Sequence, residues 1–129
     1  MGRPSHVRAA IEEILRASER HAWSIEDVSA ALDRRGIHPD PSSVFRGLMS
    51  LADQERISRV ELGDGKLRFE AKRPHHEHIA CESCGDVAAV PGCLVEGLVP
   101  QVERQTGFAV RAHRLVFSGV CSACAGRPA

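Results

Sequence analysis

The segment His75-His76-Glu77-His78-Ile79-Ala80-Cys81-Glu82-Ser83-Cys84 decides how this chain of 129 residues is organised. It ends in a Cys-x-x-Cys pair, and a second pair, Cys121-Ser122-Ala123-Cys124, lies near the end of the sequence. Two residues between thiolates let both sulfurs of one turn reach a single tetrahedral ion. Two such pairs complete a shell of four thiolates, which is the closed, structural kind of zinc site. We therefore predict that Cys81, Cys84, Cys121 and Cys124 bind structural zinc; disulfides or redox-active pairs are the alternative.

The three histidines before Cys81 indicate metal binding of another kind. If residues 75–80 form a β-strand, its side chains alternate between two faces. His75 and Glu77 then point to one side, and His76 and His78 point to the other. A strand so polar on both faces cannot enter a core unless those groups are bound to something. This strand is therefore expected to supply half of each of two metal sites; a solvated, histidine-rich loop is the alternative.

Size and composition restrict the class of protein. The length suits one ordinary domain or two small ones, and one Trp, four Phe and no Tyr leave little aromatic material for a core. A structural metal is one remedy for a small core. Because 17 Lys and Arg balance 17 Asp and Glu, any nucleic-acid binding must rely on locally placed arginines rather than on bulk charge. No apolar run approaches about 18 residues and no signal-peptide pattern opens the chain, so we expect no membrane span and, with reduced thiols, a cytoplasmic location.

The first half of the chain predicts three helices followed by a hairpin. Apolar residues recur at helical spacing over residues 5–20, with Ser5 as N-cap, and over a segment capped by Ser24 and ended by Gly36. A third helix is expected to begin at Ser42 or Ser43, after the Pro-containing turn. Strands at 57–62 and 66–70 follow, joined by a tight glycine-flanked turn.

Three helices and a hairpin in this order are typical of a winged helix, whose third helix enters the major groove of DNA. Phe45 and Arg46 are expected on the outer face of its first turns, where the helix end favours phosphate and Arg can reach a guanine edge. The hairpin offers basic side chains to the DNA backbone, although an ordinary charged surface would also explain them. The candidate DNA-binding residues are Ser43, Phe45, Arg46, Arg59 and Lys66, with Arg68 as a further phosphate contact.

Composition changes after the polar, proline-ended segment 71–74, and Cys and His appear beyond it. We therefore predict a DNA-binding domain at 1–71, a hinge at 72–74 and a metal-binding domain at 75–129. In the second domain we expect a strand at 86–90, a helix within 93–106 and one or two strands within 108–120 that include His113. Pro100 lies either in the first turn of a helix that starts near Gly97 or at a kink. Residues 125–129 are expected to be a frayed tail.

With these features in view, the chain resembles the ferric uptake regulator family from about Val7 to Cys124. The most specific match is 75–85 followed by the second Cys-x-x-Cys pair; Ser43-Val44-Phe45-Arg46-Gly47-Leu48 and the wing at 63–70 support it. The resemblance implies an α+β protein with an N-terminal winged helix-turn-helix domain and a C-terminal α/β dimerisation domain that holds the four-cysteine zinc. It also implies a homodimeric repressor of metal-homeostasis genes that binds double-stranded DNA at a palindromic operator.

The resemblance further implies two ligand sets. Glu70, His76 and His78 match the family's regulatory metal site, and His21 is the nearest match to the histidine that completes it. His75, Glu77, Glu96 and His113 match a further site in the dimerisation domain. Histidine and carboxylate ligands suit Fe(II), Mn(II) and Zn(II) alike. No Cys occurs between Phe69 and His75, where zinc-sensing members often carry a ligand, which shifts the weight toward iron or manganese.

In the expected mechanism, metal binding selects one angle between the domains. In a dimer this angle fixes the distance between the two recognition helices at about one DNA turn (~34 Å) or another fixed span. Three alternatives remain open: a peroxide sensor that uses bound iron, a small zinc hydrolase using His76, Glu77 and His78, and a DNA-binding protein whose histidine sites stay empty. The fifth cysteine, Cys93, is expected to be a small buried hydrophobe rather than a ligand.

Overall fold

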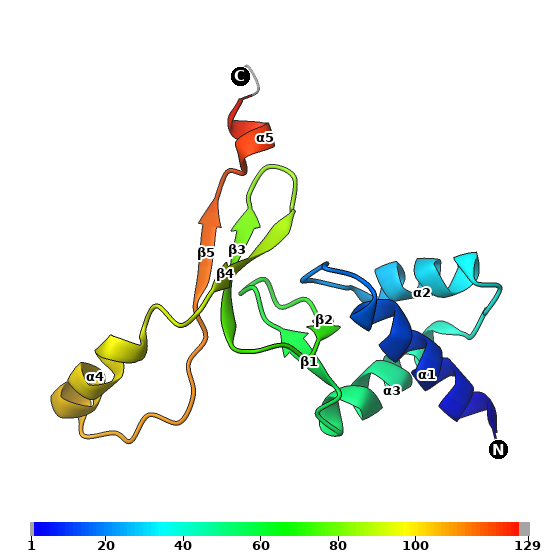
Figure 1. Ribbon diagram of the computed structural model, residues 1–129, viewed down its shortest axis with the longest axis horizontal. Helices are drawn as coiled ribbons and strands as arrows, with labels where there is room; N and C mark the ends of the chain where they lie inside the picture. Colours follow the sequence, from blue (N-terminus) through cyan, green and yellow to red (C-terminus); the bar gives the residue numbers. More distant parts are fainter. Residues whose placement is uncertain (1, 127–129) are drawn as a thin grey trace. The chain divides into compact units, whose positions relative to one another are not determined.

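The computed structural model describes residues 2–126, with side chains from residue 6 onward, and falls into two compact units divided between Arg73 and Pro74. Unit 1 contains α1 (Gly2–Arg16), α2 (Ile25–Arg34), α3 (Pro41–Asp53), β1 (Ile57–Val60) and β2 (Arg68–Ala71). Unit 2 contains β3 (His76–Cys81), β4 (Val87–Pro91), the 3-10 helix η1 (Glu96–Leu98), α4 (Val99–Thr106), β5 (Val116–Gly119) and α5 (Ser122–Ala125) (Figure 1).

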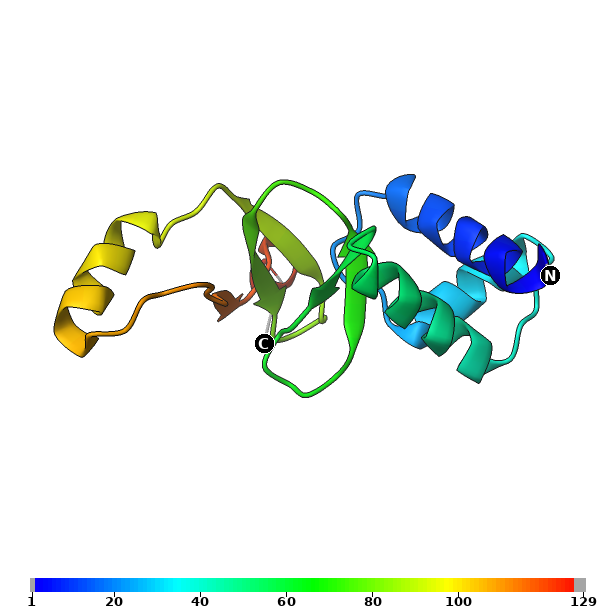
Figure 2. The ribbon, with the colours of Figure 1, turned by 90° about the horizontal axis from the view of Figure 1, so that it is seen from below.

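Unit 1 is a winged helix built on one apolar core. Its largest fully buried side chains come from all three helices and from the hairpin: Ile11, Leu15, Val28, Leu32, Val44, Leu48, Ile57, Val60 and Phe69. α1 lies beside α3 (Figure 2), and the close approach uses Gly47, because a Cβ there would stand 3.1 Å from Ile11 Cδ1. The antiparallel hairpin runs in register from Ile57 opposite Ala71 to Val60 opposite Arg68.

The segment before α2 is tied to the hairpin. Trp23 forms an isolated bridge with Phe69, in which the Trp23 N–H donates to the Phe69 carbonyl at 2.8 Å and the Phe69 N–H returns the bond at 2.9 Å. α2 then begins with the expected capping box, since the Ser24 hydroxyl accepts from the Asp27 N–H and the Asp27 carboxylate accepts from the Ser24 N–H. The connection between α1 and α2 therefore has a defined path.

Two expected helix starts are corrected. Ser5 lies inside α1, which begins at Gly2. The N-cap of α3 is Asp40 rather than Ser42 or Ser43, because Pro41 suits the first helical position and the Asp40 carboxylate accepts the Ser43 N–H at 2.7 Å. The same N–H lowers the pKa of the Asp40 carboxyl.

The strands of unit 1 are shorter than expected, and their connection is longer. β1 ends at Val60 and β2 begins at Arg68, so residues 61–67 form the wing. Within it Asp64 Oδ1 accepts from the Lys66 N–H at 3.0 Å. Ala71, expected at the start of a linker, is instead buried in β2 opposite Ile57.

Unit 2 is built on a three-stranded sheet of order β4-β3-β5, in which β4 is antiparallel and β5 parallel to β3. A parallel partner requires a long crossover, and η1 and α4 lie on the excursion that leaves β4 and returns to β5 (Figure 1). α4 begins at Val99 with Pro100 in its first turn, which decides between the two expected positions of Pro100, and the left-handed Gly107 ends it as predicted.

Three details of unit 2 differ from the sequence predictions. Only Val116–Gly119 forms a strand within 108–120, and His113 lies before it. Within residues 2–126 the sheet holds β4, β3 and β5, and no strand pairs with 108–115. Ala125, expected in the frayed tail, belongs to α5, and residues 127–129 lie outside the described part. None of the helices in residues 2–126 is long and apolar enough to cross a membrane.

Candidate metal centres and DNA-binding surface

The four cysteines of the two Cys-x-x-Cys pairs converge at one end of the sheet in unit 2. Their sulfurs all lie within 4.8 Å of one another, and Cys84 Sγ is 3.8 Å from Cys121 Sγ. A tetrahedral ion with metal–sulfur bonds of about 2.3 Å requires sulfurs about 3.8 Å apart. The end of β3, the turn after it and the start of α5 thus supply a ligand set that fits structural zinc.

The thiols of this cluster differ in acidity. The backbone N–H groups of Cys121 and Cys84, which lie 3.3 and 3.5 Å from Cys81 Sγ, lower the pKa of Cys81 to about 6. The neighbouring Cys121 sulfur, followed by burial, raises the pKa of Cys124 to about 12. Four thiolates cannot crowd together without a cation, and a bound zinc ion would supply that charge.

A second group lies on one face of β3, around the buried carboxylate of Glu77. Glu77 Oε1 is 3.1 Å from His75 Nε2, and Glu77 Oε2 is 3.1 Å from His113 Nε2. The fourth member is Cys93, whose sulfur lies 3.8 Å from His113 Nε2. Glu96, which the resemblance placed in this set, is exposed in η1 and does not belong to the group.

The expectation for Cys93 is therefore corrected. This residue is half-buried, and its thiol faces an imidazole rather than an apolar core. The sequence contained one signal for a separate role of Cys93. The four-cysteine cluster accounts for four of the five cysteines and leaves Cys93 without a place in it.

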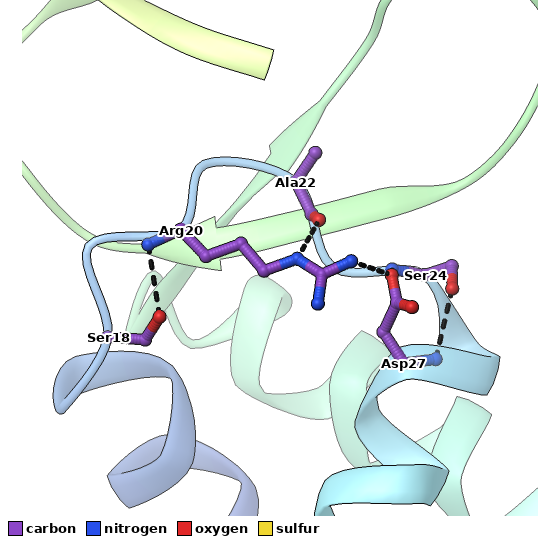
Figure 3. A network of polar contacts seen from close by, with 5 residues as sticks. All are labelled: Ser18, Arg20, Ala22, Ser24 and Asp27. Carbon is purple, nitrogen blue, oxygen red and sulfur yellow. Dashed lines mark hydrogen bonds and ion pairs between the residues drawn. The ribbon is translucent and has the colours of Figure 1, made fainter. Parts of the chain in front are cut away.

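Unit 1 supplies two of the expected regulatory ligands. His21 Nδ1 lies 3.0 Å from Oε2 of Glu70, a β2 residue whose side chain is only 4 % exposed. Figure 3 shows how Arg20 holds the loop that carries His21: its Nε donates to the Ala22 carbonyl at 3.0 Å, and its Nη2 contacts Asp27 Oδ2 at 2.6 Å. The Arg20 guanidinium also lies 4.8 Å from the centre of the Trp23 ring.

Unit 2 carries the other two expected regulatory ligands on the face of β3 opposite Glu77. The rings of His76 and His78 lie 4.7 Å apart between centroids. His76 Nδ1 donates to the Pro74 carbonyl at 2.8 Å, so the tautomer is fixed and Nε2 is the nitrogen suited to a metal.

The residues expected to bind DNA lie on α3 and the wing. Phe45 is 41 % exposed, and Arg46 Nη2 donates to the Ser43 hydroxyl at 3.2 Å near the N-terminus of α3. A groove beside α3 is lined by His6, Arg8, His38, Ser43, Arg46 and Ser50. In the hairpin, Arg59 and Lys66 are exposed. Arg68 is held by Asp64 at 2.9 Å, so its charge is partly neutralised within the wing.

A winged helix in unit 1 and grouped thiolates, imidazoles and carboxylates in both units define a DNA-binding protein with metal centres. Residues 2–118 match the family model described as the ferric uptake regulator family, and the chain belongs to that family. The zinc-hydrolase alternative is thereby excluded: the protein is a metal-dependent transcriptional regulator, not an enzyme.

Relatives with known names agree with this assignment. The chain is 31 % identical over 116 residues to the ferric uptake regulation protein of Neisseria gonorrhoeae, covering 87 % of this chain and 81 % of the relative. It is also 34 % identical over 77 residues to the transcriptional regulator PerR of Clostridium acetobutylicum, covering 60 % of this chain and 56 % of that one. A structure of the ferric uptake regulator from Francisella tularensis with iron matches with a TM-score of 0.81 at 22 % identity, over 92 % of this chain and 91 % of that chain, which supports the fold.

Proposed function

We propose that the protein is a homodimeric repressor whose corepressor is a divalent metal ion held by His21, Glu70, His76 and His78. The observation that carries this proposal is the contact between His21 and buried Glu70 in unit 1. Carboxylate oxygen and imidazole nitrogen are ligand atoms that Fe(II), Mn(II) and Zn(II) all accept. Unit 2 offers two further imidazoles on one face of β3, so each unit provides half of a mixed nitrogen and oxygen ligand set.

An ion bound by ligands from both units has a higher affinity for the arrangement that brings the two halves together. Metal binding then shifts the population toward that arrangement, and by linkage DNA that prefers it strengthens metal binding. In a dimer, the selected arrangement fixes the spacing of two copies of α3. Two half-sites of a palindromic operator require such a fixed spacing, about one DNA turn (~34 Å) or another fixed span.

The dimer is supported by the surface of unit 2. Large apolar side chains of this unit are 37 % exposed or more: Ile79, Leu94, Leu98, Val102, Phe108, Phe117 and Val120. A single chain rarely leaves so many large apolar groups in water unless a partner covers them. The structural zinc is proposed to bind Cys81, Cys84, Cys121 and Cys124 and to hold β3 and α5 together within unit 2. The dimer is proposed to act in the cytoplasm.

DNA recognition is assigned to the exposed start of α3 and to the wing. Phe45 offers an apolar face to a thymine methyl group or a sugar, and Arg46 offers two donors to a guanine edge or a phosphate. Ser43, Arg59 and Lys66 are proposed to contact phosphates. The net charge of zero means that DNA binding must rely on such locally placed contacts rather than on bulk charge.

The test uses the full-length protein with its zinc content measured first. Duplexes are selected from a random-sequence pool in the presence of Mn(II), and the selected DNA is labelled for fluorescence anisotropy. Fe(II), Mn(II) and Zn(II) are then titrated separately at fixed ionic strength. We expect palindromic DNA, two chains per duplex and affinity that rises with one of these metals. Equal affinity of the stripped and the loaded protein for the selected DNA contradicts the proposal and favours a regulator whose histidine sites stay empty.

Peroxide sensing is the second candidate function, and the 34 % identity to a PerR protein over 77 residues favours it. Iron bound by His21, Glu70, His76 and His78 would react with peroxide and oxidise one of its own histidine ligands. The test is mass spectrometry of the Fe(II)-loaded protein after peroxide treatment. One added oxygen on His21 or His76, together with loss of DNA binding, supports this function; an unmodified protein that still binds DNA excludes it.

A further inference from the structure

We propose that Cys93 is a metal ligand, and that unit 2 binds a divalent ion through His75, Glu77, Cys93 and His113. The thiolate takes the position that the family resemblance gave to the carboxylate of Glu96. All four ligand atoms lie within 4.8 Å of one another. This inference depends on unit 2 alone and does not require the regulatory site.

Three distances between these ligand atoms are close to those of a tetrahedral site. With metal–nitrogen and metal–oxygen bonds of about 2.0–2.1 Å and metal–sulfur bonds of about 2.3 Å, adjacent nitrogen and oxygen atoms stand about 3.3 Å apart and adjacent nitrogen and sulfur atoms about 3.5 Å apart. Both Glu77–histidine distances are 3.1 Å, and Cys93 Sγ lies 3.8 Å from His113 Nε2. The two histidine contacts involve different oxygens of Glu77, and all four ligand atoms lie within 4.8 Å of one another, so a bound ion needs only local side-chain shifts.

The carboxylate at the centre of the group is the strongest reason to expect a cation. The Glu77 side chain is 3 % exposed, and each of its oxygens faces a different imidazole nitrogen. The two imidazole rings also contact each other edge to face, with centroids 4.9 Å apart. One carboxylate and one thiolate would neutralise a divalent ion, and each imidazole can bind that ion through a ring nitrogen.

The chain path explains why Cys93 is present in the group and Glu96 is not. Cys93 follows the left-handed turn at Gly92, directly after β4, and His113 lies three residues before β5. These two residues mark the two ends of the excursion that carries α4 (Figure 1). Glu96 lies further along it, exposed in η1. An ion bound to Cys93 and His113 would therefore tie both ends of the excursion to β3.

The thiolate also changes which metal the site prefers. A ligand set with one sulfur and two imidazoles suits borderline-soft ions such as Zn(II) and Co(II) better than Mn(II), which prefers oxygen. This site should therefore bind zinc under conditions where a site with only nitrogen and oxygen ligands, such as the proposed regulatory site, still accepts manganese or iron.

The experiment uses full-length protein that retains one zinc ion in the four-cysteine shell. With that shell closed, Cys93 is the fifth and only remaining cysteine. Co(II) is titrated while the near-ultraviolet thiolate-to-cobalt charge-transfer absorption is recorded. In parallel, alkylation of Cys93 by iodoacetamide is followed with and without added Zn(II). The regulatory ligands contain no sulfur, so cobalt bound there gives no such absorption, and failure of the regulatory proposal leaves this readout unaffected.

We expect a charge-transfer band at one Co(II) per chain and protection of Cys93 from alkylation by Zn(II). Cys93→Ser should remove the band and weaken binding at least about tenfold, since even partners outside the ligand set cost about 10–100-fold. Glu96→Ala, a matched change in the same excursion, should retain the band. The proposal is overturned by a band that survives in Cys93→Ser, by metal binding that leaves Cys93 open to alkylation, by loss of binding in Glu96→Ala alone, or by the absence of a second bound ion.

Discussion

His21 and Glu70 are 49 positions apart in the sequence, yet His21 Nδ1 lies 3.0 Å from Glu70 Oε2. Replacing His21 by Ala should weaken the affinity for the regulatory metal at least about tenfold, because the change removes a ligand itself and not a residue that only orients a ligand. The measurement is DNA-binding anisotropy as a function of Mn(II) concentration. We expect the midpoint to move to higher metal concentration, with the affinity at saturating metal less affected.

His38→Ala is the matched control for this change. His38 is another histidine of unit 1, it is exposed, and it pairs with Asp33 at 2.8 Å. Because His38 also lines the groove beside Arg46, the two variants are compared by calorimetric titration of Mn(II) without DNA. The loss of His38 should leave that Mn(II) affinity unchanged. If His21→Ala and His38→Ala give the same metal response as the unchanged protein, His21 is not a ligand.

Arg20 acts on the same site indirectly. Its guanidinium contacts the Ala22 carbonyl and Asp27 and covers the Trp23 ring, so it fixes the loop on which His21 lies. Arg20→Ala should weaken metal binding by about tenfold, the lower end of what orienting partners contribute. Calorimetric titration of Mn(II) measures this effect. Arg20→Lys retains a charge but not the forked geometry, and should recover only part of the affinity; full recovery would show that charge alone is sufficient.

The four-cysteine cluster predicts a pH-dependent zinc affinity. Zinc binds thiolates, and in the metal-free protein the pKa of Cys124 is raised to about 12 while that of Cys81 is lowered to about 6. At about pH 7, zinc binding should therefore release a proton from Cys124, and apparent affinity should rise with pH. Below about pH 6 protonation of Cys81 should weaken binding further. Calorimetry in buffers of different ionisation enthalpy counts the protons; zinc binding without proton release contradicts this assignment.

Removing one ligand of this cluster should also destabilise unit 2. Cys84→Ser leaves an incomplete shell, so the protein should lose its bound zinc and with it the folding free energy that zinc binding contributes. Elemental analysis and thermal unfolding measure both effects. Ser83→Ala, in the same turn, is the control and should keep one zinc ion per chain.

Local patterns in the sequence were enough to predict the features that depend on neighbouring residues. The Cys-x-x-Cys spacing identified a cluster whose sulfurs lie within 4.8 Å of one another. The Ser24 and Asp27 pair predicted the capping box that the structure contains. Period-2 alternation correctly separated His75 and Glu77 from His76 and His78, because a strand leaves only two directions for its side chains.

Features that depend on the chain path could not be read in this way. Cys93 meets His113 because the excursion between β4 and β5 returns to its starting point, and no local periodicity encodes that return. Helical spacing does not explain a glycine at position 47, whereas the structure shows that Gly47 lets α1 approach α3. Asp40 was missed as a cap because Pro41 can be interpreted either as a block to helix formation or as the first helical residue.

The exposed apolar surface of unit 2 predicts that a charge there breaks the dimer. Val102 on α4 is 45 % exposed, and Leu98 precedes it by one helical turn. Val102→Glu would bury an unpaired carboxylate in the interface, and should raise the dimer dissociation constant at least about tenfold. Sedimentation equilibrium measures the change. Arg104→Glu adds a carboxylate on the opposite, polar side of α4 and should leave the dimer intact; equal dissociation of both variants would place the interface elsewhere.

Arg46 is exposed at the start of α3, where its Nη2 lies 3.2 Å from the Ser43 hydroxyl. Arg46→Ala should weaken binding to the selected DNA. If Arg46 binds a phosphate, the slope of log affinity against log salt concentration should fall by about 1, with similar losses on all sequences. If it reads a guanine, one base position should lose its preference, worth about 1–3 kcal/mol. Arg35→Ala, an exposed arginine that follows α2 and pairs with Glu13 at 3.3 Å, is the matched control. Because Arg46 belongs to neither ligand set, its loss should leave the Mn(II) affinity measured by calorimetry without DNA unchanged. A changed Mn(II) affinity with unchanged DNA affinity would contradict its place at the DNA surface.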